Sequence, residues 1–304
     1  MSHFTRRGLL SLPSGLRSLI LGRIHAAPTT SLPQPRYFST SSAFHSDHSS
    51  VNQDEVSHFN ALASSWWDPQ GSSRLLHLMN PPRHDFIRQC LNSHIREPGK
   101  KLRYLDVGSG GGIFAESAAR LPNTHSVTAI DPSPEVVSVA KRHQRQDPLL
   151  LEQGRLSYRN CSIEELPLPT SAETAVDVLT VFEVIEHIRQ PAPFLQACLK
   201  HIKPGGWLIG STIARTNTSW FTTKLMAEDV LGVVPRGTHD WNQYIQPHEL
   251  RAWARTQPDV DAEFQGWQIM GVVYVPGMGW KEIPSSEDWG NYFFGVRKKQ
   301  VEAN

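Results

Sequence analysis

The chain has 304 residues, of which 39% are hydrophobic, and its formal net charge at neutral pH is +1. This composition is ordinary for a globular protein, and it excludes a collagen, a coiled coil and wholesale disorder. The three cysteines are far apart and have no ligand spacing, so we expect reduced thiols and no disulfide framework or zinc ribbon. No run approaches the roughly 20 apolar residues that span a bilayer. Any contact with a membrane is therefore expected to be peripheral.

The first 46 residues contain five arginines and no acidic residue before Asp47. On a helical wheel their leucines share one face and several arginines another, which is typical of a mitochondrial transit peptide. We therefore expect residues 1–45 to be disordered or removed, and the protein to lie in the mitochondrion. The rest of the chain is net acidic and has no basic run before its C-terminal end, which argues against a nucleic-acid partner.

Residues 46–100 are expected to form a helical cap, and the core begins with a strand that runs into a glycine turn, residues 102–112. Glycines let the backbone approach a ligand, and the N–H groups of a helix expected over 113–121 face that ligand. A dinucleotide site needs a third glycine at the position of Ile113. The pattern that remains is the Asp-x-Gly-x-Gly of S-adenosylmethionine-dependent methyltransferases, with Gly108 and Gly110 against the donor.

After the glycine turn, strand-like and helical segments alternate. We expect strands over 126–130, 156–160, 175–181 and 207–212, and helices over 134–144 and 193–202. This alternation predicts a parallel sheet with ligands at the carboxyl ends of its strands. Two last strands, 267–275 and 292–297, should pair as an antiparallel hairpin. The order predicts an α/β class I methyltransferase fold, a Rossmann-like seven-stranded sheet over residues 101–300, with a substrate or membrane insertion at about 213–250.

Three residues are candidates for contact with the donor. Asp131 ends the second strand, where a carboxylate can accept hydrogen bonds from both ribose hydroxyls, although it could also cap the following helix. Ile163 follows the third strand and is placed to make an apolar contact with the adenine, although a position in a surface turn is nearly as consistent with the sequence. Arg83 could pair in bidentate fashion with the methionine carboxylate, although by itself a surface arginine is the simpler interpretation.

The end of the fourth strand carries Glu183, Glu186 and His187. If a helical turn begins there, the i, i+3 and i, i+4 spacing places all three side chains on one face. Two carboxylates and an imidazole suit a divalent metal ion with open positions for a substrate. The alternative is that Glu186 and His187 serve helix capping or loop structure, as in methyltransferases that use no metal.

Several stretches carry a more specific resemblance, above all Trp66–Pro69 and Gly237–Trp241. Over residues 52–298 the chain resembles the ubiquinone-biosynthesis O-methyltransferase family in its mitochondrial form, enzymes that methylate polyprenylated catechol intermediates of coenzyme Q. The resemblance implies that the donor is bound by Arg83, Gly108, Asp131 and Phe182. It also implies that a metal ion is held by Glu183, Glu186 and His187. The metal implied is Mg²⁺, but a histidine ligand would better suit Zn²⁺ or Mn²⁺. Ser109 departs from the usual cysteine of the family, which should matter little because the backbone contacts the donor there.

The resemblance also implies a polyprenylated substrate, peripheral contact with the matrix side of the inner mitochondrial membrane, and membership of a multi-enzyme coenzyme Q complex. A metal bound to both catechol oxygens would favour the phenolate and select one oxygen for methylation. Four aromatic residues are our candidates for contact with the head group: Trp66, Trp67, His239 and Trp241. Two other functions stay open, a methyltransferase that acts without metal on another acceptor and a non-catalytic scaffold of a coenzyme Q assembly.

Overall fold

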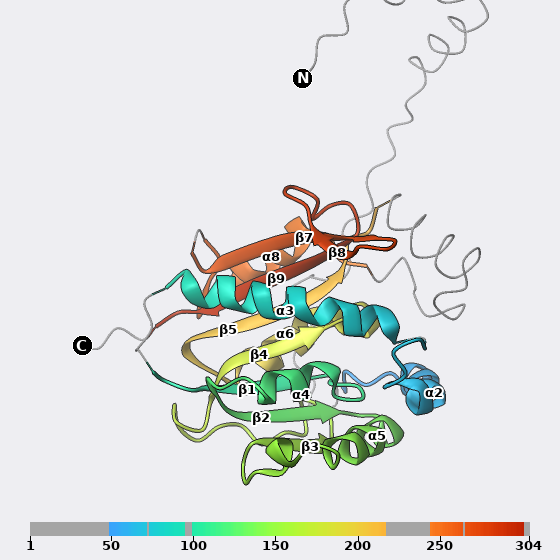
Figure 1. Cartoon of the computed structure of the whole chain (residues 1–304). Helices are drawn as coiled ribbons and strands as arrows, with labels where there is room; N and C mark the ends of the chain where they lie inside the picture. Colours follow the sequence, from blue (N-terminus) through green and yellow to red (C-terminus); the bar gives the residue numbers. More distant parts are fainter. Residues whose placement is uncertain (1–48, 72, 95–98, 217–243, 264, 301–304) are drawn as a thin grey trace, which may run out of the picture. The chain divides into compact units, whose positions relative to one another are not determined.

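One mixed sheet runs through the part of the chain that the structure describes, and helices cover both of its faces (Figure 1). The structure is a computed structural model, and it describes residues 49–71, 73–94, 99–216, 244–263 and 265–300. The transit peptide expected over 1–45 and most of the insertion expected over 213–250 lie outside these residues.

Five strands form the parallel part of the sheet, in the order β3-β2-β1-β4-β5. Both β1 and β4 are buried along nearly their whole length, as expected for central strands with helices on both faces. The bounds of the five strands are β1 Leu102–Val107, β2 Thr124–Asp131, β3 Leu156–Asn160, β4 Val176–Phe182 and β5 Ile202–Ile213.

The C-terminal strands pair as predicted, because β9 (Asn291–Lys298) lies antiparallel between β5 and β7 (Trp267–Val275). The connection between them is not a plain loop. Gly277 and Gly279 take φ values of 80° and 74°, and the chain turns back so that β8 (Gly279–Glu282) pairs with β7. A two-residue strand, β6 (Val260–Asp261), adds to β9. The expected seven-stranded fold is thus confirmed, with two short extra strands.

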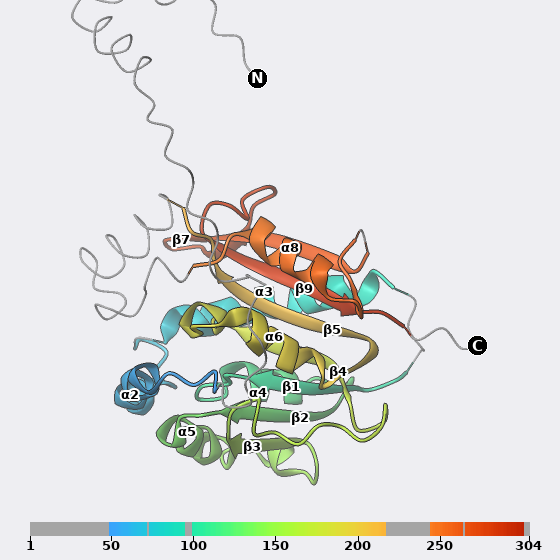
Figure 2. The same ribbon diagram turned by 180° about the vertical axis from the view of Figure 1, so that it is seen from behind.

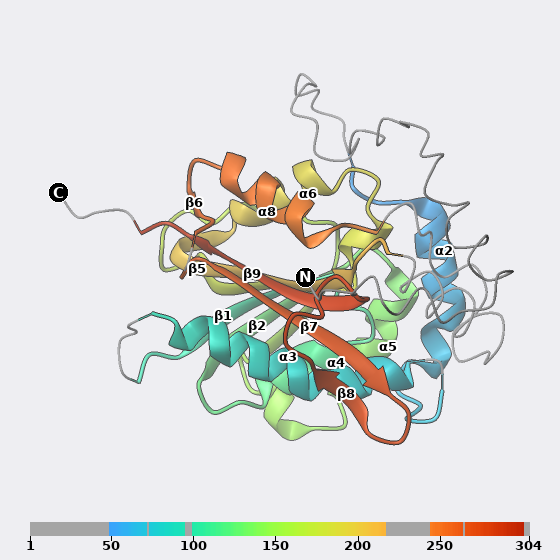
Figure 3. The ribbon, with the colours of Figure 1, turned by 90° about the horizontal axis from the view of Figure 1, so that it is seen from above.

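Helices form a layer on each face of the sheet (Figure 3). Side chains of α3, α4 and α5 share one core cluster with residues such as Phe293 of β9. Side chains of α6 and α8 share the other with Tyr292 and Phe294, which point to the opposite face because successive strand residues alternate. The helix bounds are α2 Gln53–Leu62, α3 Arg74–Asn92, α4 Ile113–Ala119, α5 Pro134–Gln144, α6 Pro191–Leu199 and α8 Pro247–Thr256.

The view from behind shows α2 at the carboxyl ends of the parallel strands and α6 and α8 over the sheet (Figure 2). The segment expected as one cap therefore divides into two parts. α2 has no buried residue and lies at the mouth, whereas α3 packs along the sheet against α4, β8 and β9. Among the described residues, no helix is both long enough and apolar enough to cross a membrane.

Two boundaries differ from expectation for local reasons. α6 begins at Pro191, not at residue 193, because proline fits the first turn of a helix. β5 begins at Ile202, not at residue 207, and it includes an irregular segment, Lys203–Gly206, where Gly205 has a φ of 76° and the pairing with β4 shifts register. The Pro-Gly-Gly sequence thus forms an irregularity inside a longer strand.

Candidate functional site

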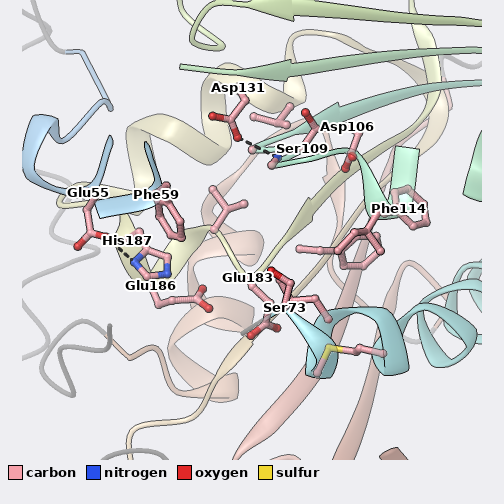
Figure 4. A pocket seen from close by; sticks show the side chains of 18 of the residues that line it. Glu55, Phe59, Ser73, Asp106, Ser109, Phe114, Asp131, Glu183, Glu186 and His187 are labelled. Carbon is pink, nitrogen blue, oxygen red and sulfur yellow. Dashed lines mark hydrogen bonds and ion pairs between the residues drawn. The ribbon is translucent and has the colours of Figure 1, made fainter. Parts of the chain in front are cut away.

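A cavity of about 520 Å³ opens at the carboxyl ends of the parallel strands (Figure 4). Its lining comes from the ends of β1, β2 and β4, from α2 and α3, and from β7 and β8. Ligands of open α/β sheets bind at this edge, and the volume is in the range of small-molecule sites. The sequence predicted this location from the order of strands and helices alone.

The glycine turn after β1 is held in a conformation that favours glycine at three positions. Gly108, Gly110 and Gly112 have φ values of 69°, 53° and 90°, where a side chain is strained. The N–H groups of Gly108 and Ser109 donate to the carbonyl of Ile130, which ties the turn to β2. The backbone of the turn therefore faces the cavity in a position that these hydrogen bonds to β2 fix.

Two carboxylates stand beside this turn. Asp131 Oδ2 accepts from the Gly110 N–H and Oδ1 from the Ser133 N–H, each at 2.9 Å. Burial raises the pKa of Asp131 to about 6 although these two N–H groups favour the charged form. Asp106 Oδ1 accepts from Thr180 Oγ1 at 2.7 Å, and burial raises its pKa to about 7. A carboxylate has about four acceptor positions, so Asp131 can shape the turn and still accept ribose hydroxyls.

Arg83 is a buried residue of the cavity lining and not a surface arginine, since only 4% of it is exposed. Its guanidinium lies 4.8 Å from the centroid of the Phe182 ring, and its Nη1 is 3.5 Å from Asn80 Oδ1. Burial lowers the pKa of Arg83, and the nearby charges of Glu183 and Asp106 act in the opposite direction and raise it. Among the described residues its buried Nε has no hydrogen-bond partner. Arg83 thus brings a cationic donor group to the cavity, supported by Phe182.

Glu183, Glu186 and His187 do not lie on one face of a helical turn, so that expectation is wrong. β4 continues to Phe182, and Glu183 then takes a φ of 55°, which interrupts any helix. Only Ile185–His187 forms a turn of 3₁₀ helix. The i, i+3 and i, i+4 spacing therefore does not place the three side chains on one helix face, although they remain close enough to influence one another's charge.

Each of these three side chains has a partner within the protein. Burial, with the nearby charge of Glu183, raises the pKa of Glu186 to about 8. Within the described residues, no three His, Cys, Asp or Glu side chains are grouped so that they could hold a metal ion. The ligand set of the expected metal is therefore not assembled in this part of the chain, although the buried Glu186 Oε1 has no hydrogen-bond partner there. The partners are Ser211 Oγ for Glu183 (2.6 Å), Thr212 Oγ1 for Glu186 (2.9 Å) and the Glu55 carboxylate for His187 Nδ1 (3.0 Å).

Comparison with known proteins agrees with this geometry. Residues 105–210 match a family model described as a methyltransferase domain. The chain is 38% identical over 288 residues to the "Ubiquinone biosynthesis O-methyltransferase, mitochondrial" of Candida albicans, which covers 82% of this chain and 86% of the relative. It is 43% identical over 254 residues to the protein of that name from Schizosaccharomyces pombe, covering 82% and 87%. The chain belongs to the ubiquinone biosynthesis O-methyltransferase family.

Solved structures support the fold of this methyltransferase. The plantazolicin methyltransferase BpumL in complex with SAH superposes with a TM-score of 0.53 at 15% identity, covering 81% of this chain and 99% of that one. A methyltransferase from Thermotoga maritima gives a TM-score of 0.50 at 17% identity, covering 79% and 98%. At such identities the likeness concerns the fold alone. The chain is an S-adenosylmethionine-dependent methyltransferase, as predicted.

The residues of the cavity fit the methyl donor. The glycine turn has the positive φ values of a backbone cradle, and the carboxylate of Asp131 can accept from ribose hydroxyls. Arg83 Nε, which has no hydrogen-bond partner in the described part of the chain, can donate to a carboxylate. Ile163 is 2% exposed and lines the same end, and Phe182 lies under Arg83. All six residues predicted for donor binding line one cavity, and their individual contacts stay predictions.

Of the four aromatic residues predicted for the head group, the structure describes Trp66 and Trp67, and these two have different surroundings. Trp66 is 8% exposed and lines the cavity, with its indole against Gly110 and Gly111. Trp67 is not among the lining residues, because its indole stacks on His143 of α5 at 3.5 Å and donates to the Gly111 carbonyl at 2.8 Å. His239 and Trp241 lie outside the described residues. Their contacts with a substrate stay predictions.

Two groups of lining residues were missed by the sequence. Glu55 and Phe59 of α2 meet His187 across the mouth, and the Phe59 and His187 rings pack edge to face at 5.2 Å. Trp280 of β8 and Trp289 also line the cavity. No local spacing marks these contacts, because the partners are more than a hundred residues apart. The one available signal was the concentration of aromatic residues in the C-terminal segment.

Proposed function

We propose that the protein transfers a methyl group from S-adenosylmethionine to a hydroxyl of a polyprenylated catechol in ubiquinone biosynthesis. The observation that carries this proposal is one cavity whose lining combines two chemically different groups of residues. The glycine turn and Asp131 suit the donor, whereas Val272, Tyr274 and Trp280 suit an apolar acceptor. The fungal relatives, named for ubiquinone biosynthesis, support this choice of acceptor.

When bound, S-adenosylmethionine would supply a methyl group on a sulfonium: the phenolate oxygen of the acceptor would attack the methyl carbon in line, and the C–S bond would break with neutral S-adenosylhomocysteine as the leaving group. The protein contributes position and the exclusion of water. Asp131 and the glycine turn fix one end of the donor, Arg83 holds its carboxylate, and α2 covers the mouth. Alignment of this kind accounts for about 7–11 kcal/mol of a barrier in favourable cases. A phenol with a pKa near 10 is a poor nucleophile at neutral pH, so alignment matters here.

A metal-assisted form of the reaction, with Mg²⁺, Zn²⁺ or Mn²⁺, is a separate prediction. Glu183, Glu186 and His187 are each engaged within the protein, so no step of this proposal depends on a metal. Methylation that persists after exhaustive chelation would support the reaction without a metal. Activity that is lost on chelation and restored by one ion would show instead that residues 183–187 rearrange to bind it.

The cellular setting follows from the relatives and the N-terminal composition. The fungal relatives are named mitochondrial, and residues 1–45 have the composition of a transit peptide. We place the protein in the mitochondrion, on the matrix side of the inner membrane as a peripheral protein. A multi-enzyme coenzyme Q complex is the partner that this placement suggests. Co-purification with inner-membrane vesicles, compared with release by high salt, tests the peripheral contact.

The direct test offers the purified protein a catechol with a short prenyl chain and S-adenosylmethionine, and follows products by mass spectrometry. We expect one added methyl group, and a much smaller yield from an analogue that lacks both hydroxyls. Asp131→Ala should lose donor binding, whereas Asp85→Ala, at an exposed acid of α3, should behave like the parent. Donor binding without methylation of the catechol would direct the search to another acceptor.

A further inference from the structure

One part of the cavity lining is a preformed apolar wall from the β7–β8 hairpin and its neighbours. Val272 and Tyr274 lie two residues apart on β7, and Trp280 is the cross-strand partner of Tyr274, so the three share one face of the β7–β8 hairpin. The Tyr274 and Trp280 rings pack edge to face at 5.5 Å. We call these three residues, with Leu76 and Trp289, the hairpin wall. All five line the cavity.

A hydrogen bond fixes this wall to the helix layer. Trp280 Nε1 donates to the carbonyl of Leu75 in the first turn of α3 at 3.1 Å, and Trp280 packs against the core cluster that contains α3. Figure 3 shows β8 beside α3, and their residues are in contact. The hairpin is therefore held in place without a ligand. Such a wall can bind a flexible apolar chain without first paying to order itself.

The outer rim of the wall exposes large apolar side chains. Trp289 lines the cavity and is nevertheless 52% exposed, and Met278 at the hairpin turn is 65% exposed. Leu78 lies one turn along α3 from Leu75 and is also exposed. The lining residues that β7, β8 and the first turn of α3 contribute carry no charge. The apolar lining thus continues from the interior of the cavity to its outer edge.

We propose that the hairpin wall binds the first isoprene units of the acceptor's tail and that the tail leaves the cavity past Trp289. This inference rests on the proposed function, because it needs an acceptor with a polyisoprenoid substituent. An acceptor oxygen must reach the donor end, so the tail attached to the same ring must cross another part of the lining. The hairpin wall is uncharged, preformed and open at Trp289, which are the properties that a chain longer than the cavity requires.

The test measures how the kinetics depend on tail length in the full chain. The acceptors are catechols with zero, one, two and three isoprene units, and the variants are Trp289→Ala and Trp289→Phe. For the parent protein, KM should fall as units are added. For Trp289→Ala, KM for the three-unit catechol should rise about 10-fold while kcat changes little. A 10-fold change corresponds to about 1.4 kcal/mol, or roughly 55 Å² of lost apolar contact at about 25 cal/mol per Å².

The controls separate tail binding from damage to the fold. Trp289→Phe should recover most of the tail-length dependence, because a phenyl ring keeps much of the apolar contact. Leu168→Ala changes an apolar residue that is 57% exposed and outside the lining, and it should match the parent. Donor affinity by calorimetry reports whether each variant is folded. An equal rise of KM for every tail length, or no change, would overturn the inference.

A tail without a head group distinguishes this inference from the proposed function. A three-unit isoprenoid alcohol should bind the parent and quench its tryptophan fluorescence, and it should bind Trp289→Ala about 10-fold more weakly. If the alcohol binds in this way but no catechol is methylated, the proposed function is wrong and the inference that the hairpin wall binds isoprene units still holds. If the tail-free catechol is methylated and tail length has no effect, the catechol methyltransferase function holds and the inference about tail binding is wrong.

Discussion

The contact between Trp66 and the glycine turn can be tested by adding one methyl group at a time. An added Cβ at Gly111 would lie within 2.9 Å of three indole atoms of Trp66, while the backbone there needs no positive φ. At Gly110 the Cβ would meet the same indole, and the residue would also have to hold a φ of 53°. At Gly154 the φ is 76° but nothing lies within 4 Å. The three sites therefore separate packing from backbone strain.

The expected losses in the free energy of unfolding follow from these two costs. A left-handed alanine costs about 1–2 kcal/mol, which is the whole effect at Gly154. Overpacking costs about 1–3 kcal/mol, which is the whole effect at Gly111. Gly110→Ala combines both and should lose about 2–5 kcal/mol. Urea denaturation with an unchanged m value measures each difference, and calorimetry measures donor affinity. Only the variants at Gly110 and Gly111 should weaken donor binding.

A double-mutant cycle identifies the indole as the cause. Trp66→Ala alone should cost about 3–5 kcal/mol, because it leaves a void against the turn. In that background Gly111→Ala should cost about 1–2 kcal/mol less than in the parent, since its methyl group enters the void. If Gly111→Ala costs the same with and without the indole, Trp66 does not rest on the turn and the reasoning is refuted.

Two further predictions concern Arg83 and α2. Arg83→Lys keeps a charge but loses the planar guanidinium over Phe182, so donor affinity measured by calorimetry should fall about 10-fold with little change in stability; an unchanged affinity would remove Arg83 from the donor site. Glu55→Gln removes the ion pair to His187 at the mouth, worth about 0.5–1 kcal/mol, so hydrogen exchange of residues 53–62 should accelerate about 2- to 5-fold. Unchanged exchange would show that other contacts hold α2.

The donor end was predictable because its signals are local or periodic. The glycine turn, the strand order and the position of Asp131 at the end of β2 all follow from spacing along the sequence. The identity of the donor followed from one pattern of three residues. The boundaries that differed lie at a proline in the first turn of α6 and at glycines in β5, where the outcome depends on the pairing with β4.

Other features that the sequence did not show share one physical cause, which is a tertiary contact that overrides a local pattern. Glu183 was expected on a helix, but its N–H donates to Ser211 of β5 and fixes a left-handed conformation at the end of β4. Trp66 and Trp67 are neighbours in sequence, yet one faces the cavity and the other stacks on α5. Arg83 is buried because the ring beneath it belongs to a strand a hundred residues away. None of these contacts has a signature within a short window.

The charges of the donor end link binding to protons. Asp106 and Asp131 lie in a buried site, and burial raises their pKa values to about 7 and about 6. A donor with a sulfonium and a net positive charge would favour the ionised form of both side chains and so lower these pKa values. Below about pH 7 the empty site binds more protons than the loaded site, so donor binding should release protons and tighten as the pH rises from 5 to 7.

Calorimetry in buffers of different ionisation enthalpy measures that release directly. S-adenosylhomocysteine, which lacks the sulfonium charge, is the matched ligand and should release fewer protons at pH 6.5. Asp131→Asn should reduce the release for both ligands, because one titrating group is gone. Equal proton release by the charged and uncharged ligands would mean that the carboxylates respond to occupancy and not to charge. The buried acids would then serve to shape the turn and would contribute nothing to selection of the cationic donor.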